Sequence, residues 1–350
     1  MRTSLWFLVV STTFLALVSC SKTSTPDQPG EASIVAWAVG SMDTNGIGTI
    51  LHSADAGETW VRQGDSTMFG GIDISNVWAI DSNNAWIVCS GNRIFRTIDG
   101  GVNWIPVLTP YIPGNSNLCG LSILNNTTIW VSGENGTVYS STDAGNNWTV
   151  YDSTIFRHGM MQGIHAISEN IIYVAGELAT LSGSWGFLAR TLNGGTTWDS
   201  ITLPGGYNQH AWIGVTSVDS SCIVVYGQTG HYSVSRNGGN TWTNGEAVSP
   251  SDINCLVMLS ADAYWTANDY DKIYKTFDGG ESWVEQPSTG PSGFFLVGID
   301  NYYSQTALIV GQSATFENAG KIIKTTDGGN HWYLRHASPS RLWKVSYAKN

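Results

Sequence analysis

The chain has 350 residues, with 40 Gly and 16 Trp, and its 16 Lys and Arg against 27 Asp and Glu give a formal net charge of −11. Charged residues make up 12% of the chain, against a usual ~25%, and 42% is hydrophobic, which excludes a disordered protein and a helical bundle or coiled coil. Nucleic acid is excluded as a partner as well, because phosphate binding needs clustered Lys and Arg.

The N-terminus has the pattern of an export signal. One positive charge, on Arg2, precedes an apolar run over residues 5–18 that has the length of a signal-peptide core and is too short to span a bilayer. The run ends in Leu-Val-Ser-Cys20, which resembles a bacterial lipobox. The resemblance implies that residues 1–19 are removed as a lipoprotein signal peptide and that Cys20 carries the lipid. An ordinary secretory signal cut near Ser19 is the alternative.

Residues 20–33 follow as the lipidated Cys and a flexible tether, since they hold no aromatic residue and little apolar mass. No later stretch approaches the ~18 apolar residues of a membrane span. We therefore expect an exported protein of the bacterial cell envelope, held on a membrane by its lipid alone, with the outer membrane as the expected location. Whether it faces the periplasm or the exterior stays open.

One eight-residue pattern, Ser/Thr-x-Asp/Asn-Gly/Ala-Gly-x-x-Trp, occurs seven times, with successive Trp residues 41 to 50 residues apart. A period of this length with strand-like flanks predicts propeller blades. In each copy the Asp or Asn is expected to accept backbone N–H bonds from residues ahead of it and a Gly to take positive φ, so that the octapeptide clasps two strands of a hairpin. The seven structural positions are Asp55, Asp99, Asp143, Asn193, Asn237, Asp278 and Asp327.

The octapeptide resembles the Asp box, or BNR repeat, of sialidases and sortilin-type receptors. In those families the box lies on the blade periphery, away from the ligand site, so the resemblance implies a structural role for these Asp and Asn residues.

Three strand-like segments accompany each octapeptide. The segments expected as first strands form a set of seven, and one member of this set stands out of order. The seventh member, Leu342 to Ala348, follows the last octapeptide, whereas no such segment precedes the first. We therefore predict an all-β fold over residues 34–350, a single seven-bladed β-propeller of four-stranded blades. The C-terminal strand is expected to be the innermost strand of blade 1, which closes the ring and removes open sheet edges.

Four cysteines lie within the predicted propeller, and their spacing offers no metal signature. No cofactor or metal is predicted. Cys89 and Cys119 are expected at one face of neighbouring blades, so that a disulfide between them is one possibility in an exported protein. The other possibility is four small buried thiols, with Cys222 and Cys255 as the remaining two.

The loops that join blades share a face with the turns between the second and third strands, and propeller ligands usually bind at that face. A polar residue follows the second strand of every blade there. These residues are either solvated strand ends or a mildly acidic rim around the channel mouth. They are Ser41, Ser90, Glu134, Glu177, Gln228, Asn268 and Gln312.

Other candidate ligand contacts are aromatic and basic residues of the loops at the same face, because such residues commonly anchor interfaces. His165, on an innermost strand, is expected to be a structural residue, with a channel-facing role as the alternative. The loop candidates are Arg157, His158, Trp185, Tyr207, His210 and Trp212.

Catalysis finds little support in the sequence. Glu134 and Glu177 occupy matching positions in adjacent blades and are the one carboxylate pair that spacing nominates for glycoside hydrolysis. No Ser/His/Asp or Cys/His arrangement can be assembled. The Phe-Arg-Ile-Pro signature of sialidases is absent, and the chain has one propeller where xyloglucanase-like Asp-box enzymes have two.

The repeated phrasing W-A-V-G, G-T-I-L and T-x-D-G-G-x-x-W over residues 33–350 resembles the photosystem II stability/assembly factor-like propellers. Those are single, seven-bladed, non-catalytic chaperones with an Arg-rich partner surface, a feature from which this acidic chain departs. The resemblance implies the class, an exported propeller that acts as a binding scaffold. We expect a protein partner in the envelope; the alternative is carbohydrate binding or hydrolysis at the channel mouth.

Overall fold

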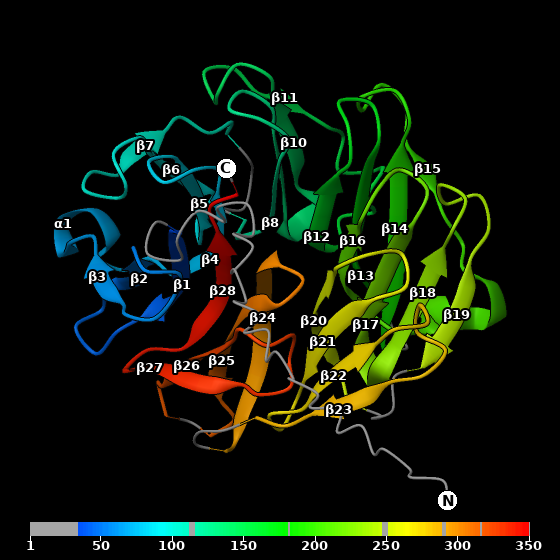
Figure 1. Cartoon of the computed structure of the whole chain (residues 1–350). Coiled ribbons are helices and arrows are strands. Elements are labelled where there is room, and N and C mark those ends of the chain that lie inside the picture. The colour runs from blue at the N-terminus through cyan, green and yellow to red at the C-terminus, as the bar shows by residue number, and fades with distance from the viewer. Residues whose placement is uncertain are drawn as a thin grey trace, which may run out of the picture. The chain divides into compact units, whose positions relative to one another are not determined.

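Seven four-stranded antiparallel sheets are arranged as the blades of a ring in the computed structural model (Figure 1). The structure describes residues 34–111, 116–180, 183–246, 251–288, 292–315 and 317–349. The expected signal peptide, Cys20 and the tether lie outside these residues. The prediction of an all-β, seven-bladed propeller is confirmed. Helix is confined to α1 (Ser66–Phe69) and the short 3-10 turns η2 (Glu134–Gly136), η3 (Pro204–Gln209) and η4 (Gln228–Gly230) within the described ranges.

Each blade has an innermost, a second, a third and an outer strand. The innermost strands, from blade 2 through blade 7 and then blade 1, are β4 (Ile74–Ala79), β8 (Leu118–Ile123), β12 (Met160–Ala166), β16 (Trp212–Ser217), β20 (Ile253–Met258), β24 (Phe294–Tyr303) and β28 (Leu342–Tyr347). The second strands, from blade 1, are β1 (Ala36–Met42), β5 (Ala85–Cys89), β9 (Ile129–Gly133), β13 (Ile172–Thr180), β17 (Ile223–Gly227), β21 (Tyr264–Asn268) and β25 (Thr306–Ser313).

The third strands carry the start of each octapeptide and the outer strands follow it. The third strands are β2 (Gly48–Ser53), β6 (Arg93–Thr97), β10 (Val138–Ser141), β14 (Gly183–Thr191), β18 (His231–Ser235), β22 (Ile273–Thr276) and β26 (Gly320–Thr325). The outer strands are β3 (Val61–Gln63), β7 (Ile105–Val107), β11 (Thr149–Val150), β15 (Asp199–Ser200), β19 (Thr243–Glu246), β23 (Val284–Gln286) and β27 (Tyr333–Ser338).

The ring is closed by the C-terminal strand, as predicted. Strand β28 pairs antiparallel with β1, with Ala36 opposite Tyr347 and Ala38 opposite Val345. Val345 and Tyr347 are buried together with residues of blades 1 and 7 in one apolar cluster. Because the first and last strands of the propeller share a blade, every blade has four strands.

The core lies between the blades. Second strands such as β5, β9, β17 and β21 are buried at every position, since both faces of a blade are covered by its neighbours. The apolar clusters accordingly combine residues of adjacent blades. The second-strand tryptophans belong to this packing: Trp37, Trp86, Trp130 and Trp265 are all buried.

The seven octapeptides, called clasps below, form one turn repeated seven times. In every copy the first-position hydroxyl accepts from the N–H of the fifth residue at 2.8–2.9 Å. The Asp or Asn Oδ1 accepts from the N–H of the seventh residue at 2.8–2.9 Å. The fourth and fifth residues have φ between 59° and 100°, which explains why they are Gly or Ala and mostly Gly. The expected clasp between two strands is confirmed.

Cys89, Cys119, Cys222 and Cys255 are free thiols, so the disulfide between Cys89 and Cys119 is not formed. Cys119 is partly exposed and the other three are buried. No helix of the described residues has the length and apolar character that crossing a membrane would require.

Candidate functional site

The face that carries the inter-blade loops and the turns between second and third strands is called the rim face. Several of its seven polar rim residues form hydrogen bonds with other residues of the propeller. Ser90 Oγ accepts from the Asp73 N–H at 3.1 Å, and Gln228 Oε1 accepts from the Ala211 N–H at 3.2 Å. These bonds join the end of a second strand to the start of the innermost strand of the same blade. They satisfy backbone groups that the bulged strand start leaves unpaired.

Glu134 makes the most developed of these contacts. Its carboxylate accepts from both the backbone N–H and the side-chain amide of Asn117, each at 3.1 Å. Gln312 accepts from the Trp343 indole N–H at 3.0 Å, and Asn268 is completely buried. Glu177 differs, because its carboxylate makes no hydrogen bond within the described part of the chain. Their matching positions in adjacent blades had suggested that the two glutamates are equivalent. The structure shows that they are not, because only Glu134 is hydrogen-bonded.

Exposed side chains are nevertheless prominent on the rim face. Leu108 is 85% exposed and Tyr111 90% exposed in the connection from blade 2 to blade 3, and Tyr270 is 69% exposed in blade 6. Trp185 is 43% exposed. It lies on strand β14 opposite Leu178, so Trp185, which was expected in a loop, belongs to an extended β-hairpin instead.

Arg157 and His158 are exposed in the connection from blade 3 to blade 4, and both have left-handed backbone conformations, with φ of 51° and 52°. Two consecutive non-glycine residues in this region store strain, a condition that functional loops often show. The bonds from Arg157 N–H to Thr154 O and from His158 N–H to Ser153 O fix the turn. Both side chains are thus presented to solvent by a defined backbone.

The remaining loop candidates divide between surface and core. His210 stacks on His231 with ring centroids 4.0 Å apart, and Thr229 Oγ1 lies within hydrogen-bond distance of both rings. Burial, followed by the nearby His231, lowers the pKa of His210. Trp212 is completely buried between blades 4 and 5, because it begins strand β16 rather than ending a loop, so it is not available to a ligand. The side chain of Tyr207 lies outside the described residues.

A central channel of about 450 Å³ is lined by all seven innermost strands. Its lining extends past the ends of β4, β8 and β28 to Ile80, Leu124 and Lys349, toward the face that carries the clasps. None of the seven rim residues lines it. The channel is therefore separate from the seven rim residues at which a ligand was expected.

A β-bulge in each innermost strand shapes the channel. The register with the second strand shifts by one residue in every blade. A bulge bends its strand and redirects the side chains that follow it. Asn76 of β4 and Lys344 of β28 come directly after the shift, and both line the channel.

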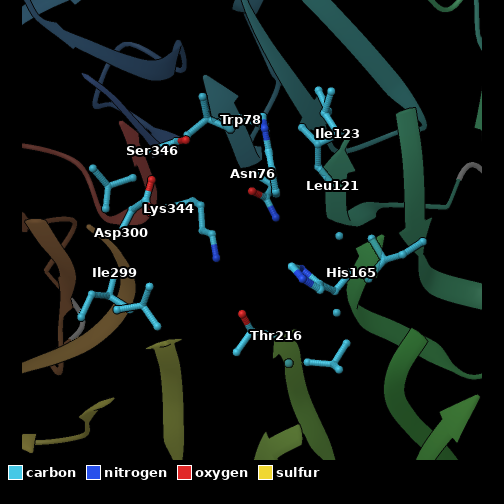
Figure 2. Close-up of a pocket in the computed structure, with 18 of the residues that line it drawn as sticks. Asn76, Trp78, Leu121, Ile123, His165, Thr216, Ile299, Asp300, Lys344 and Ser346 are labelled. Carbon is cyan, nitrogen blue, oxygen red and sulfur yellow. The ribbon is translucent and has the colours of Figure 1, made fainter. Parts of the chain in front are cut away.

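Four polar side chains point toward the middle of the channel in Figure 2: Asn76, His165, Thr216 and Lys344. His165 lies within hydrogen-bond distance of Ser217, with 2.9 Å between Nε2 and Oγ. Burial, with a smaller contribution from the Lys349 charge, lowers the pKa of His165 to about 4. His165 is thus a neutral channel residue with a structural partner, which combines the two alternatives considered for it.

Lys344, Asn76 and Thr216 were not among the sequence candidates. Lys344 could have been noticed in the sequence. The seven innermost strands contain two charged residues, Lys344 and Asp300, and one histidine, His165. Asn76 and Thr216 carry no comparable signal. Among the described residues no group of three His, Cys, Asp or Glu side chains is placed to hold a metal ion.

No family model matches the chain, and no curated protein matches it. Solved structures do. YCF48 from Cyanidioschyzon merolae is 17% identical with a TM-score of 0.62, over 85% of this chain and 97% of that one. YCF48 bound to D1 peptide is also 17% identical, with a TM-score of 0.55 over 75% of this chain and 80% of that one. An ancestral GH74 enzyme is 14% identical, with a TM-score of 0.56 over 79% of this chain and 38% of that one.

The class defined by the topology is therefore a seven-bladed β-propeller whose ring is closed by the pairing of strand β28 with strand β1. At these identities the similarity to YCF48 and to the GH74 enzyme is a similarity of fold.

Proposed function

We propose that this chain is a non-catalytic, lipid-anchored protein of the bacterial cell envelope whose propeller binds a protein partner through its rim face. The observation that carries the proposal is the set of exposed large side chains on that face. Leu108, Tyr111 and Trp185 follow one another on the connections and turns of blades 2 to 4, with the exposed Arg157 and His158 between them. Exposed aromatic and Arg residues on a rigid scaffold are the usual anchors of protein interfaces.

Two further points support this choice over an enzyme. Neither Glu134 nor Glu177 lines the channel, so the nominated carboxylate pair is not placed at that cavity, where a substrate could be enclosed. A propeller of the same fold, YCF48, has been solved with a bound D1 peptide, which supports peptide binding as a use of this fold. The membrane anchor rests on the lipobox-like sequence that ends at Cys20.

The partner is tested with the full chain as bait in envelope extract, followed by crosslinking mass spectrometry. The double variant Tyr111→Ala/Trp185→Ala is compared with Val102→Ala/Leu192→Ala, which removes exposed apolar side chains from the clasp face. Capture and crosslinks on the rim face are expected for the wild type and the clasp-face control, with a loss of about tenfold or more in the rim-face variant. Equal capture by all three proteins would contradict the proposal.

A glycan array run beside the capture distinguishes the carbohydrate alternative. Saturable glycan binding that is lost in Trp185→Ala or Glu177→Gln, with no captured protein, would replace the proposed function by carbohydrate recognition. The anchor is tested separately by membrane fractionation and intact-mass measurement. Cys20→Ser is expected to release the protein from the membrane fraction and to remove the mass of the lipid, and an unchanged distribution would contradict lipidation.

A further inference from the structure

We propose that the central channel is a receptor site for a small carboxylate that also carries a hydroxyl or ammonium group, the chemistry shared by hydroxy acids and amino acids. Lys344 binds the carboxylate in this proposal, and Asn76 accepts a hydrogen bond from the neighbouring donor. The site lies inside the channel, and none of its residues belongs to the rim-face set proposed for the protein partner.

The charges of the channel leave one cation uncompensated. Its charged lining residues are Lys344, Lys349 and Asp300. Lys349 Nζ is 2.7 Å from Asp300 Oδ1, and Asp300 Oδ2 also accepts from the Tyr347 N–H at 2.9 Å, so this carboxylate is already occupied. The Lys344 ammonium has no hydrogen-bond or ion-pair partner among the described residues, although it projects into the channel (Figure 2).

An uncompensated ammonium in a partly enclosed cavity favours an anion, because Coulomb attraction strengthens as water is excluded. The chain as a whole carries a formal charge of −11, so general surface charge does not attract anions to it. The preference therefore has to arise locally, from Lys344. His165 also lines the channel, and because its imidazole is neutral it adds no charge to the site.

Asn76 adds a requirement for a hydrogen-bond donor. Its Nδ2 donates to the Cys119 carbonyl at 2.9 Å, which fixes the orientation of the amide. Its Oδ1 is buried without a partner in the structure. Buried polar atoms are normally paired, so an unpaired acceptor in the same channel as an unpaired ammonium indicates a ligand with both an anionic group and a donor. Thr216 supplies a further hydroxyl toward the same space.

The size of the channel limits the ligand. A volume of about 450 Å³ lies at the lower end of the range of small-molecule sites, roughly 300–1,000 Å³. Trp78, Leu121 and Ile123 give part of the wall an apolar character. A molecule of the size of a monosaccharide acid or an amino acid fits these limits, and a folded protein segment does not.

The test is isothermal titration of the full chain with single compounds. D-Gluconate and L-malate represent hydroxy acids and L-glutamate represents amino acids. Acetate lacks the donor, and glucose and glycerol lack the charge. Binding is expected for at least one hydroxy acid or for glutamate, with acetate, glucose and glycerol weaker by about tenfold or more. Binding of gluconate or malate would assign the ligand to the hydroxy acids, and binding of glutamate would assign it to the amino acids.

Two variants and a control connect binding to the channel. Lys344→Met is expected to weaken binding about tenfold or more, and Lys344→Arg to restore most of it, since Arg keeps the charge. Lys272→Met removes an exposed cation that is paired with Glu285 on blade 6 and should leave binding unchanged. Equal binding by the wild type and Lys344→Met, or no binding of any of the three acids at about 10 mM, a concentration at which even weak millimolar sites fill, would overturn the proposal.

Thermal unfolding verifies that each variant is folded. If Lys344→Met does not fold, Asn76→Leu takes its place. That variant is expected to lose the preference for hydroxy acids or glutamate over acetate, and retention of the full preference would count against the site.

Discussion

Lys275 Nζ donates a hydrogen bond of 2.7 Å to the Gly328 carbonyl oxygen, so that a buried lysine of blade 6 holds the clasp of blade 7. The same relationship recurs around the ring with different donors. A side chain of one blade reaches the clasp of the next through the pairs Gln63 to Gly100, Arg96 to Ala144, Tyr151 to Gly194, Arg190 to Gly238 and Tyr232 to Gly280. From blade 7 to blade 1, Lys324 reaches the Glu58 carboxylate at 2.8 Å.

The clasp thus has two functions, one within its blade and one between blades. In six of the seven copies the carbonyl of a positive-φ residue accepts from the preceding blade, and in blade 1 the Glu58 carboxylate accepts instead. This explains why the octapeptide repeats even though its Asp residues lie away from the channel: each copy joins two neighbouring sheets whose apolar faces are packed together.

Replacing Lys275 by Met tests this bond. Met keeps the apolar packing of the lysine stem but leaves the Gly328 carbonyl without its charged donor and removes the cation 4.4 Å from the Trp265 ring. The free energy of unfolding should fall by about 2 kcal/mol, measured by urea denaturation. Lys272→Met is the control, because its exposed ion pair with Glu285 contributes less than about 1 kcal/mol. Equal losses in the two variants would count against the inter-blade role.

Removal of residues 340–350 tests the closure of the ring. The deletion takes away β28, leaves the inner edge of β1 unpaired and exposes the cluster around Val345. Loss of the cooperative unfolding transition, or a large decrease in its midpoint, is expected in differential scanning calorimetry. A milder version compares Val345→Asp at the buried position with Val218→Asp at an exposed one. The first should destabilise strongly because a charge would be buried, and the second should have little effect. A deletion variant with an unchanged melting temperature would contradict closure by this strand.

The clasps should give the protein a characteristic acid sensitivity. Hydrogen bonds from the Ser282 side chain and then its backbone N–H lower the pKa of Asp278 to about 2, from an ordinary value near 4. A carboxylate whose pKa is lower in the folded chain stabilises the fold above its unfolded pKa and loses that contribution as the pH falls toward the folded value. Unfolding free energy attributable to Asp278 should therefore decrease between about pH 4 and pH 2.

Asp278→Asn is the matched variant, because Asn193 and Asn237 already form clasps with the same backbone bond. Denaturation curves recorded from pH 5 to pH 2 should show a shallower loss of stability for the variant than for the wild type. Parallel losses would contradict the assignment to Asp278.

His165 should titrate far below an ordinary histidine. Its pKa is about 4 because the ring is buried in the channel wall and lies near the Lys349 charge. The unfolded chain takes up a proton near pH 6.5 while the folded ring stays neutral, so this contribution to stability is present above pH 6.5 and is lost as the pH falls toward 4. NMR of the imidazole C–H resonances should show a midpoint near pH 4. A midpoint near 6.5 would mean that the ring is solvated, and His165→Gln should flatten the stability profile in the same window.

The sequence alone determined the number of blades, the position of the clasps and the strand that closes the ring. These features are local or periodic: the clasp is a turn of eight residues with its own hydrogen bonds, and its spacing counts the blades.

Only the tertiary structure decided where a ligand has room. Trp212 was grouped with surface aromatics, but the packing of blades 4 and 5 buries it, and the rim residues Glu134 and Gln228 turn back onto their own backbone. The channel depends on the bulges of the innermost strands and on the packing of β4 against β28, which come from opposite ends of the chain. Such an arrangement follows from long-range strand register, so no local pattern could bring Asn76 and Lys344 to the same cavity.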